Sequence, residues 1–274
     1  MDVRHVPFGV LLRRWREQRR VTQMDLALAA ESSTRHLSFL ETGKAEPSRE
    51  MVGRLAECLD IPLRDRNTLL LAAGFAPVFS ERSVSELEAA KAAIDSVLKS
   101  HAPYPAFAVD RHWNIVLSNA ALPQLYEGCS AELLQKPVNA VRLTLHPEGL
   151  GRRILNFEAL RAHTLSLLRQ QLAARVDPVI KALLTEIAGY PVPPGSEPLE
   201  SFGAAQRLAT PLHLSTRFGV VSFLNTLTVF GTPNDVTLSE LALEMLFPAD
   251  DKTIEIVNDM VRESNAPAAM KAAS

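Results

Sequence analysis

The sequence predicts an all-α N-terminal domain of five short helices followed by a larger α+β domain. Its 274 residues exceed the roughly 100–200 residues that are usual for one domain. In the first 75 residues, apolar side chains recur at helical spacing between capping residues and glycines. From Pro105 onward, runs of strand-forming residues alternate with helical patterns. We therefore expect two domains of different fold class.

The five N-terminal helices have clear starts and stops in the sequence. Thr22, Ser33 and Ser48 are side chains that cap helix N-termini, and Gly43 and Gly74 favour the positive φ that ends a helix. The helices are expected at residues 8–19, 23–29, 33–42, 47–59 and 63–73.

A sixth, longer amphipathic helix is expected at residues 81–100, where Val84, Leu87, Ile94 and Leu98 share one face. It is either a linker, a dimer seam or a helix packed on the C-terminal domain. The expected organisation is a DNA-binding domain at 1–78, a linker helix at 79–100, a ligand-binding domain at 101–262 and a flexible tail at 263–274.

The C-terminal domain begins with a β-hairpin and ends with helices. Strands are expected at residues 106–109, 115–118, 209–215 and 219–230. Helices are expected at residues 121–126, 154–175, 178–188, 238–247 and 251–263. Residues 191–198 contain four prolines and a glycine, which indicates a surface loop.

Composition excludes several classes of protein. With 47% hydrophobic and 22% charged residues, the chain is neither disordered nor collagen-like. It has no signal-peptide pattern and no apolar run long enough for a membrane span, and its two cysteines are isolated. We expect a cytoplasmic protein with no membrane partner. Although the net charge is −2, six arginines and one acid fall within residues 4–20, which suits a small DNA-binding element.

The N-terminal pattern resembles the helix-turn-helix of the phage-repressor-like XRE family. It is carried by Thr22-Gln23-x-x-Leu26-Ala27, then Ser33-Thr34-Arg35-His36-Leu37-Ser38-x-Leu40-Glu41-x-Gly43-Lys44, then Pro47-Ser48. Glu31-Ser32 replaces the small turn residue that the family usually has before the third helix. The resemblance covers about a quarter of the chain and implies binding to double-stranded DNA.

A helix of about ten residues with a polar face can enter a major groove. The resemblance places Ser33, Thr34, Arg35 and Phe39 at base-facing positions, and Arg35 is suited to guanine. Gln23 and Ser48 lie at helix starts that suit phosphate. The predicted DNA-binding residues are Gln23, Ser33, Thr34, Arg35, His36, Ser38, Phe39, Lys44 and Ser48. The arginines of the first helix either attract phosphate or form an ordinary solvated face, and Glu41 is interpreted as a structural partner.

The rest of the chain resembles the MmyB-like transcription regulators. Residues 105–119 are similar to the opening hairpin of PAS-like sensor domains. Further matches are Leu71-Ala-Ala-Gly74-Phe-Ala-Pro77, Leu145-His-Pro-Glu-Gly149, Asn156-Phe-Glu158, Phe230-Gly-Thr-Pro-x-Asp235-Val-Thr-Leu and Met245-Leu-Phe-Pro-Ala-Asp250. The resemblance implies a PAS-like domain that binds a fatty-acid-like molecule, couples it to DNA binding, and acts in a homodimer.

Four residues are candidates for contact with such a ligand: Asn119, Arg142, His146 and Trp113. Arg142 is a charge inside an apolar run and is the type of side chain that grips a carboxylate with two hydrogen bonds. The alternatives are a turn asparagine, a surface arginine, a capping histidine and a core tryptophan.

Catalysis and metal binding are not indicated. No nucleophile elbow, zinc-protease or phosphate-binding motif occurs, and the seven histidines lack ligand spacing. We therefore expect no catalytic residue, no metal and no cofactor apart from a bound fatty acid as ligand. The predicted function is a sequence-specific regulator that binds an operator and a small apolar ligand. Two alternatives stay open: a second domain that only dimerises, and an enzyme that uses the PAS-like cavity.

Overall fold

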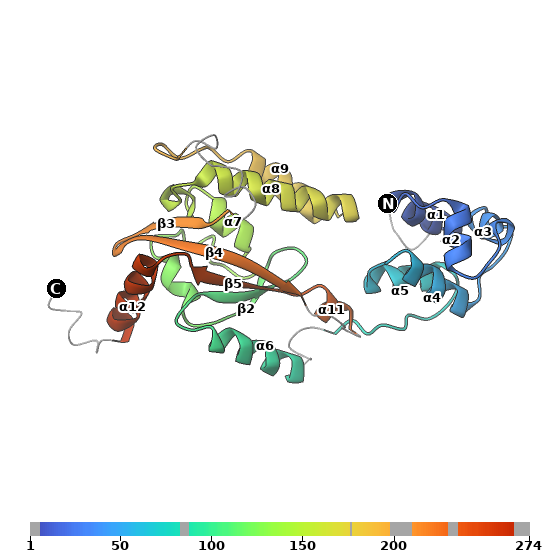
Figure 1. Cartoon of the computed structure of the whole chain (residues 1–274), viewed down its shortest axis with the longest axis horizontal. Helices are drawn as coiled ribbons and strands as arrows, with labels where there is room; N and C mark the ends of the chain where they lie inside the picture. Colours follow the sequence, from blue (N-terminus) through green and yellow to red (C-terminus); the bar gives the residue numbers. More distant parts are fainter. Residues whose placement is uncertain (1–5, 83–87, 176, 198–209, 230–234, 266–274) are drawn as a thin grey trace. The chain divides into compact units, whose positions relative to one another are not determined.

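The computed structural model describes residues 6–82, 88–175, 177–197, 210–229 and 235–265 (Figure 1). The chain forms two compact units. One comprises Met1–Ser83 together with Gly231–Ser239, and the other comprises Val84–Phe230 together with Glu240–Ser274. The first is all-helical apart from its connections and the second combines helices with a sheet, so the predicted fold class is confirmed.

The N-terminal unit contains the five expected helices within one or two residues of their predicted ends. These are α1 (Phe8–Gln18), α2 (Gln23–Ala29), α3 (Thr34–Glu41), α4 (Arg49–Cys58) and α5 (Leu63–Ala72). The hydroxyl oxygens of Thr22, Ser33 and Ser48 each accept a hydrogen bond from a backbone N–H in the first turn of the following helix. Gly43 ends α3 with a φ of +72°.

Close packing of α1 against α3 fixes the position of the third helix. Leu12, Leu37 and Leu40 are at most 1% exposed and belong to one core. A Cβ placed on Gly9 would lie 2.4 Å from the Leu40 carbonyl oxygen, so the two backbones approach as only a glycine permits. The helix that carries the predicted DNA-reading residues is therefore held by the rest of the unit.

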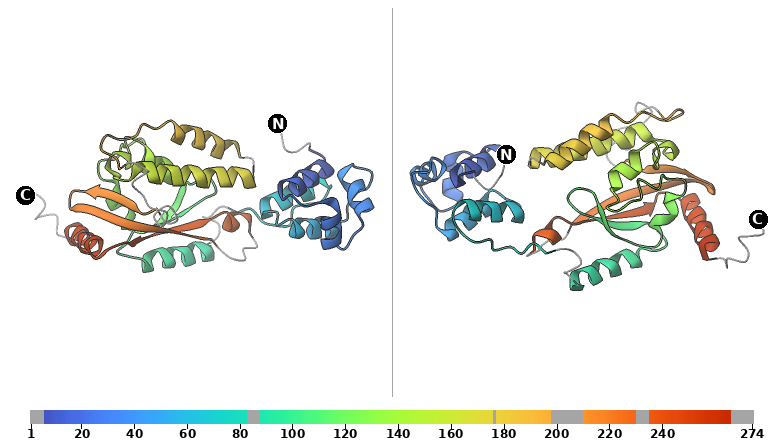
Figure 2. Two further views of the ribbon diagram at one scale, coloured as in Figure 1. Left: turned by 45° about the horizontal axis from the view of Figure 1, so that its top comes forward. Right: turned by 180° about the vertical axis from the view of Figure 1, so that it is seen from behind.

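The second unit is built on a five-stranded antiparallel sheet of order β2-β1-β5-β4-β3. The strands are β1 (Ala106–Val109), β2 (Ile115–Ser118), β3 (Leu212–Thr216), β4 (Gly219–Val229) and β5 (Ala242–Pro248). The other elements are α6 (Glu88–Ser100), the short 3-10 helices η3 (Leu122–Tyr126) and η4 (Gly151–Arg153), α7 (Ala140–Leu145), α8 (Phe157–Ala174), α9 (Pro178–Ala188) and α12 (Asp251–Asn265). Figures 1 and 2 show α7, α8 and α9 over one face of the sheet and α6 over the other.

Helix α6 packs on the sheet of its own unit. Its Ile94 and Leu98 are fully buried, and the helix contacts β1 and β2. Of the three interpretations given to residues 81–100, the described part of this helix therefore fits packing on the C-terminal domain. Some expected segments lie outside the described residues. These are residues 83–87 of the expected helix, the start of the strand expected at 209, the strand end at 230 and most of the expected tail.

One predicted helix is wrong. Residues 238–247 were expected to be helical because leucines recur at helical spacing among good helix formers. Instead a short helix, α11 (Val236–Ser239), precedes β5, which pairs with β1 on one side and β4 on the other. A central strand gains two hydrogen-bonded neighbours and buries both faces, and this tertiary context overrides the local helical preference.

The α11 segment belongs to the N-terminal unit although the chain before and after it does not. Asp235 is 3% exposed, and its carboxylate accepts hydrogen bonds from the Thr237 backbone N–H at 2.9 Å and from the Ser80 hydroxyl at 2.8 Å. The Val236 backbone N–H donates to the Ser80 carbonyl at 2.8 Å. The two ends of this segment lead into the strands β4 and β5 of the second unit.

Candidate DNA-binding surface and ligand cavity

Helix α3 presents a polar face to solvent and an apolar face to the core. Ser33 caps it, with the hydroxyl oxygen 3.1 Å from the His36 backbone nitrogen. Thr34 and Arg35 are exposed, whereas His36 and Ser38 are half-buried. A short helix with one buried face and one exposed polar face has the form that enters a major groove.

The structure brings Arg35, Phe39 and Lys44 together. The Arg35 guanidinium carbon lies 5.3 Å from the centre of the Phe39 ring, and the Lys44 ammonium lies 6.0 Å from it. Cations are attracted to the face of an aromatic ring, so the Phe39 ring helps to hold both charges beside α3. The result is a positively charged surface beside the exposed turn of the helix, suited to phosphate and to guanine edges.

Gln23 and Glu41 belong to a buried polar network beneath this surface. The Arg16 guanidinium donates to both carboxylate oxygens of Glu41, at 2.6 and 3.0 Å, and the Gln23 amide donates to one of them at 2.8 Å. Glu41 is 8% exposed, and the guanidinium fork matches its carboxylate. Glu41 is thus a structural partner that joins α1, α2 and α3.

Two further arginines, Arg13 on α1 and Arg19 directly after it, have partners within the unit. Arg13 forms an exposed ion pair with Glu17, and Arg19 donates to the backbone carbonyls of Leu59 and Asp60. The predicted phosphate-contacting Ser48 uses its hydroxyl to cap α4, where it accepts from the Met51 N–H at 3.1 Å. Because Ser48 is exposed, the first backbone N–H groups of α4 still offer an anion-binding position.

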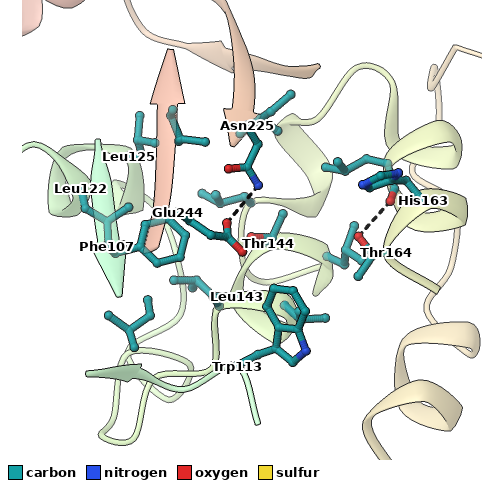
Figure 3. A pocket seen from close by; sticks show the side chains of 18 of the residues that line it. Phe107, Trp113, Leu122, Leu125, Leu143, Thr144, His163, Thr164, Asn225 and Glu244 are labelled. Carbon is teal, nitrogen blue, oxygen red and sulfur yellow. Dashed lines mark hydrogen bonds between the residues drawn. The ribbon is translucent and has the colours of Figure 1, made fainter. Parts of the chain in front are cut away.

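The second unit contains an apolar cavity of about 110 Å³ between the sheet and helices α7 and α8 (Figure 3). Its walls are aliphatic and aromatic side chains: Phe107, Ile115, Leu122, Leu125, Val141, Leu143, Leu145, Leu150, Leu160, Leu167, Leu212 and Leu246. Alternate residues of a strand face the same side, which is why Glu244 joins Leu246 in this lining.

Glu244 and Asn225 form the polar end of the cavity. Glu244 lies on the central strand β5, opposite Phe107 of β1 and Leu227 of β4, and is 8% exposed. The Asn225 amide nitrogen donates to its carboxylate at 3.0 Å, as Figure 3 shows. Burial raises the pKa of Glu244 to about 7, because the charged form loses its hydration, and the amide only partly offsets this. Asn225 is exposed, so this end of the cavity reaches solvent.

Of the four residues predicted to contact ligand, Trp113 lines the cavity. Its indole N–H donates to the Gln171 amide oxygen on α8 at 3.1 Å. Asn119 does not line the cavity. It is buried directly after β2, where its side chain accepts from the Ala106 N–H and donates to the carbonyls of Leu98 and Tyr104.

Arg142 and His146 lie in a separate polar hollow. The Arg142 guanidinium donates to both oxygens of Glu186 at 2.7 Å, and the ion pair lowers the pKa of that carboxyl. His146 accepts from the Glu148 N–H and packs edge-to-face on Tyr190. Neither residue is among those that line the apolar cavity. Contact of Arg142 and His146 with a ligand stays a prediction. In the structure, both side chains already have partners within the protein.

Sequence reasoning missed Glu244 and Asn225. Glu244 falls within residues 238–247, for which a helix was predicted, so its position among apolar residues carried no meaning. If the segment had been recognised as a strand, alternation would have placed Glu244 and Leu246 on one face. Asn225 had no comparable signal, because a single amide in a strand is uninformative.

The described residues offer neither a metal site nor a membrane-spanning helix. No group of three or more His, Cys, Asp or Glu side chains in the described ranges is placed to hold a metal ion. Within the same ranges, no helix is both long and apolar enough to cross a membrane.

Comparisons with known proteins agree with this division. The model of the MmyB-like transcription regulator ligand binding domain matches residues 90–258, and the model of a helix-turn-helix domain matches residues 7–69. None of the curated proteins compared with the chain matches it. Among solved structures, the clp gene regulator ClgR from Corynebacterium glutamicum is 30% identical over a region that covers 38% of this chain and 97% of that chain, with a TM-score of 0.23.

Proposed function

The chain belongs to the MmyB-like transcription regulator family, and from this premise we propose that it binds a DNA operator in a manner controlled by a fatty-acid-like ligand. The ligand is a small molecule with an alkyl chain and a polar head, bound in the apolar cavity of the second unit. The protein acts in the cytoplasm, as a homodimer whose two α3 helices read half-sites roughly 34 Å apart.

The observation that carries the DNA-binding part is the surface made by Arg35, Phe39 and Lys44 on a helix that is rigidly held from behind. The buried network of Arg16, Gln23 and Glu41, together with the close approach at Gly9, supports a fixed orientation of α3. A rigid reading helix loses little conformational entropy when it binds. We assign base contact to Arg35 and Phe39, and phosphate contact to Lys44 and to the starts of α2 and α4.

The ligand-binding part rests on the apolar cavity and its single polar end. Cavities lined by apolar side chains with a few convergent polar groups are typical small-molecule sites. This observation favours a sensor over a domain that only dimerises. An enzyme would need convergent acid, base or nucleophilic groups, and the described lining is mainly aliphatic.

Control of DNA binding requires the ligand to favour one arrangement of the protein over another. Support for such a link comes from the chain path: Asn225 on β4 and Glu244 on β5 flank the α11 segment, which groups with the N-terminal unit. A ligand that shifts these strands would therefore act on a segment bonded to Ser80. The coupling expected for such systems is about 1–3 kcal/mol, or 5-fold to 150-fold in operator affinity.

The test uses the purified full chain. Duplexes are selected from a random pool, and binding to the selected operator is measured by fluorescence anisotropy, with and without straight-chain amphiphiles from hexyl to dodecyl. We expect a preferred sequence, an affinity that falls steeply with salt, and a shift with at least one amphiphile. A protein that prefers no sequence at any salt concentration refutes the regulator, whereas a preferred sequence that no amphiphile affects refutes the ligand.

A further inference from the structure

Among the residues that the structure describes, the buried acid at the polar end of the cavity has no basic partner. The carboxylate of Glu244 has the Asn225 amide as its hydrogen-bond donor, and the residue is 8% exposed on the central strand of the sheet. A buried carboxylate is costly unless it is paired, and one neutral amide is a weak partner for a full charge. This site therefore has unused capacity to bind a cation.

No fixed cation from a lysine or arginine side chain is found in the described part of the cavity wall. His163 on α8 and Tyr126 on η3 are the other titratable groups in this lining, and burial raises the pKa of Tyr126, so that its phenol stays neutral. The Thr164 hydroxyl is engaged with the Leu160 carbonyl at 2.9 Å.

These charges discriminate between head groups. A ligand carboxylate at this end would place a second negative charge beside Glu244, with no lysine or arginine among the described lining residues to compensate it, and like charges in one site disfavour each other. An ammonium group would instead form a charge-assisted hydrogen bond to the Glu244 carboxylate. It would also replace the hydration that the carboxylate loses on burial.

We propose that the Glu244 and Asn225 end of the cavity binds the head group of a small apolar amine, with the ammonium on the Glu244 carboxylate and the apolar body against the aliphatic walls. This inference rests on the proposed function and specifies its ligand: the body is alkyl, as in a fatty acid, but the head is cationic.

The volume of the cavity limits the size of the ligand. At about 110 Å³ it is somewhat smaller than an engineered protein cavity of about 150 Å³ that binds benzene. A six-carbon body is therefore the appropriate scale for a first probe. The exposure of Asn225 leaves a route by which the head group can retain one water molecule at the mouth.

The experiment measures three probes that share one chain: hexylamine, hexanol and hexanoate. Each is titrated into the full-length protein at pH 8 by isothermal calorimetry. We expect hexylamine to bind at least tenfold more tightly than hexanoate, with hexanol between them. Glu244→Gln removes the charge without changing the shape of the side chain, and it should abolish the preference for the amine while leaving hexanol binding in place.

Two further variants make the result specific. Glu255→Gln changes an exposed glutamate of α12 in the same way and should leave all three affinities unchanged. Asn225→Lys places a cation beside Glu244 at an exposed position, and it should weaken hexylamine binding at least tenfold and strengthen hexanoate binding. Circular dichroism and a cooperative unfolding transition establish that each variant is folded.

The dependence on pH supplies an independent readout. Glu244 must be ionised to hold an ammonium, and its pKa of about 7 in the empty protein predicts that hexylamine affinity rises from pH 6 to pH 8 and then levels. The hexanol affinity should change little over this range. This rise should disappear in Glu244→Gln.

The outcomes also separate this inference from the proposed function. If hexanoate binds as tightly as hexylamine, or if Glu244→Gln weakens all three probes equally, the amine site is refuted. A fatty-acid regulator survives that result. If none of the probes binds, the amine site is refuted as well, and the operator experiment alone then decides whether the protein responds to longer amphiphiles.

Discussion

Glu41 in the N-terminal unit and Glu244 in the second unit are equally buried, at 8% exposure, but their surroundings differ. Glu41 receives three hydrogen bonds from Arg16 and Gln23, so its charge is fully compensated. From the described residues, Glu244 receives one, from the Asn225 amide. The comparison teaches that a complete network fixes a helix in place, whereas an incomplete one leaves a group available to a ligand.

The largest effect is expected from removing the cation that compensates Glu41. Arg16→Ala leaves a buried carboxylate without its main partner, and breaking a buried ion pair in this way costs about 3–5 kcal/mol of unfolding free energy. Urea unfolding reports it through Trp15 fluorescence in a Trp113→Phe background.

Arg13→Ala is the matched control, because Arg13 is three residues away on the same helix but forms an exposed pair with Glu17. It should leave the urea midpoint unchanged. Equal effects of the two substitutions would mean that the Arg16 and Glu41 pair does not stabilise the unit.

The second-largest effect is expected in how the free energy of unfolding depends on pH. The pKa of Glu244 rises from 4.5 to about 7 on folding, so the folded state binds more protons than the unfolded state between these values. The contribution of Glu244 to stability is therefore most favourable below about pH 4.5 and decreases as pH rises to about 7, by roughly 3 kcal/mol.

Glu244→Gln should remove this loss, and the difference between wild type and variant isolates it because other groups titrate in both proteins. Urea unfolding is followed at several pH values through Trp113, in a Trp15→Phe background. Parallel stability curves for the two proteins would show that Glu244 carries no unfavourable charge at neutral pH.

A third prediction tests the surface above the Glu41 network. Arg35→Ala should cost about 1–3 kcal/mol on the selected operator and relax the base preference at one position, as expected for a guanine contact. Lys44→Ala should weaken binding to all duplexes alike and reduce the salt dependence. A loss with Arg35→Ala that is equal on random DNA would assign Arg35 to phosphate instead.

The smallest effect is expected at α11, the segment that belongs to the N-terminal unit but follows β4 in the chain. Asp235→Ala removes the cap of α11 and the acceptor of the Ser80 hydroxyl, and should destabilise this segment by about 1 kcal/mol. Faster hydrogen exchange at the Val236 amide, which donates to Ser80, measures it. Arg82→Ala, at a largely exposed partner of Asp235, should have a smaller effect.

The same substitution also tests the coupling between ligand and operator. If α11 transmits the effect of the ligand, Asp235→Ala should reduce the ligand-induced change in operator affinity and leave unliganded operator binding in place. An undiminished response to ligand would show that the signal takes another route.

The two regions also differ in how far the sequence reveals them. The caps at Thr22, Ser33 and Ser48 and the stop at Gly43 are local signals, and the helices that they bound were predicted within a residue or two. The cavity is not local, since it is assembled from strands and helices between Phe107 and Leu246. Its depth depends on the pairing of β5 with two other strands, which local propensity did not reveal.

Arg142 illustrates the same limit for a single residue. A charge inside an apolar run can turn toward a cavity or toward a neighbouring helix, and the spacing in the sequence is identical in the two cases. In the structure it pairs with Glu186, which lies 44 positions later in the chain. The distance in sequence between the two partners is what hides such a pair.

Because α11 joins the helices near the amino end while its flanking strands belong to the sheet, the N-terminal unit is made from two separate stretches of polypeptide. A chimaera that exchanges the N-terminal unit between related regulators must therefore transfer residues 231–239 together with the first 83 residues. A chimaera that moves only the continuous stretch would set a foreign aspartate, or none, against Ser80.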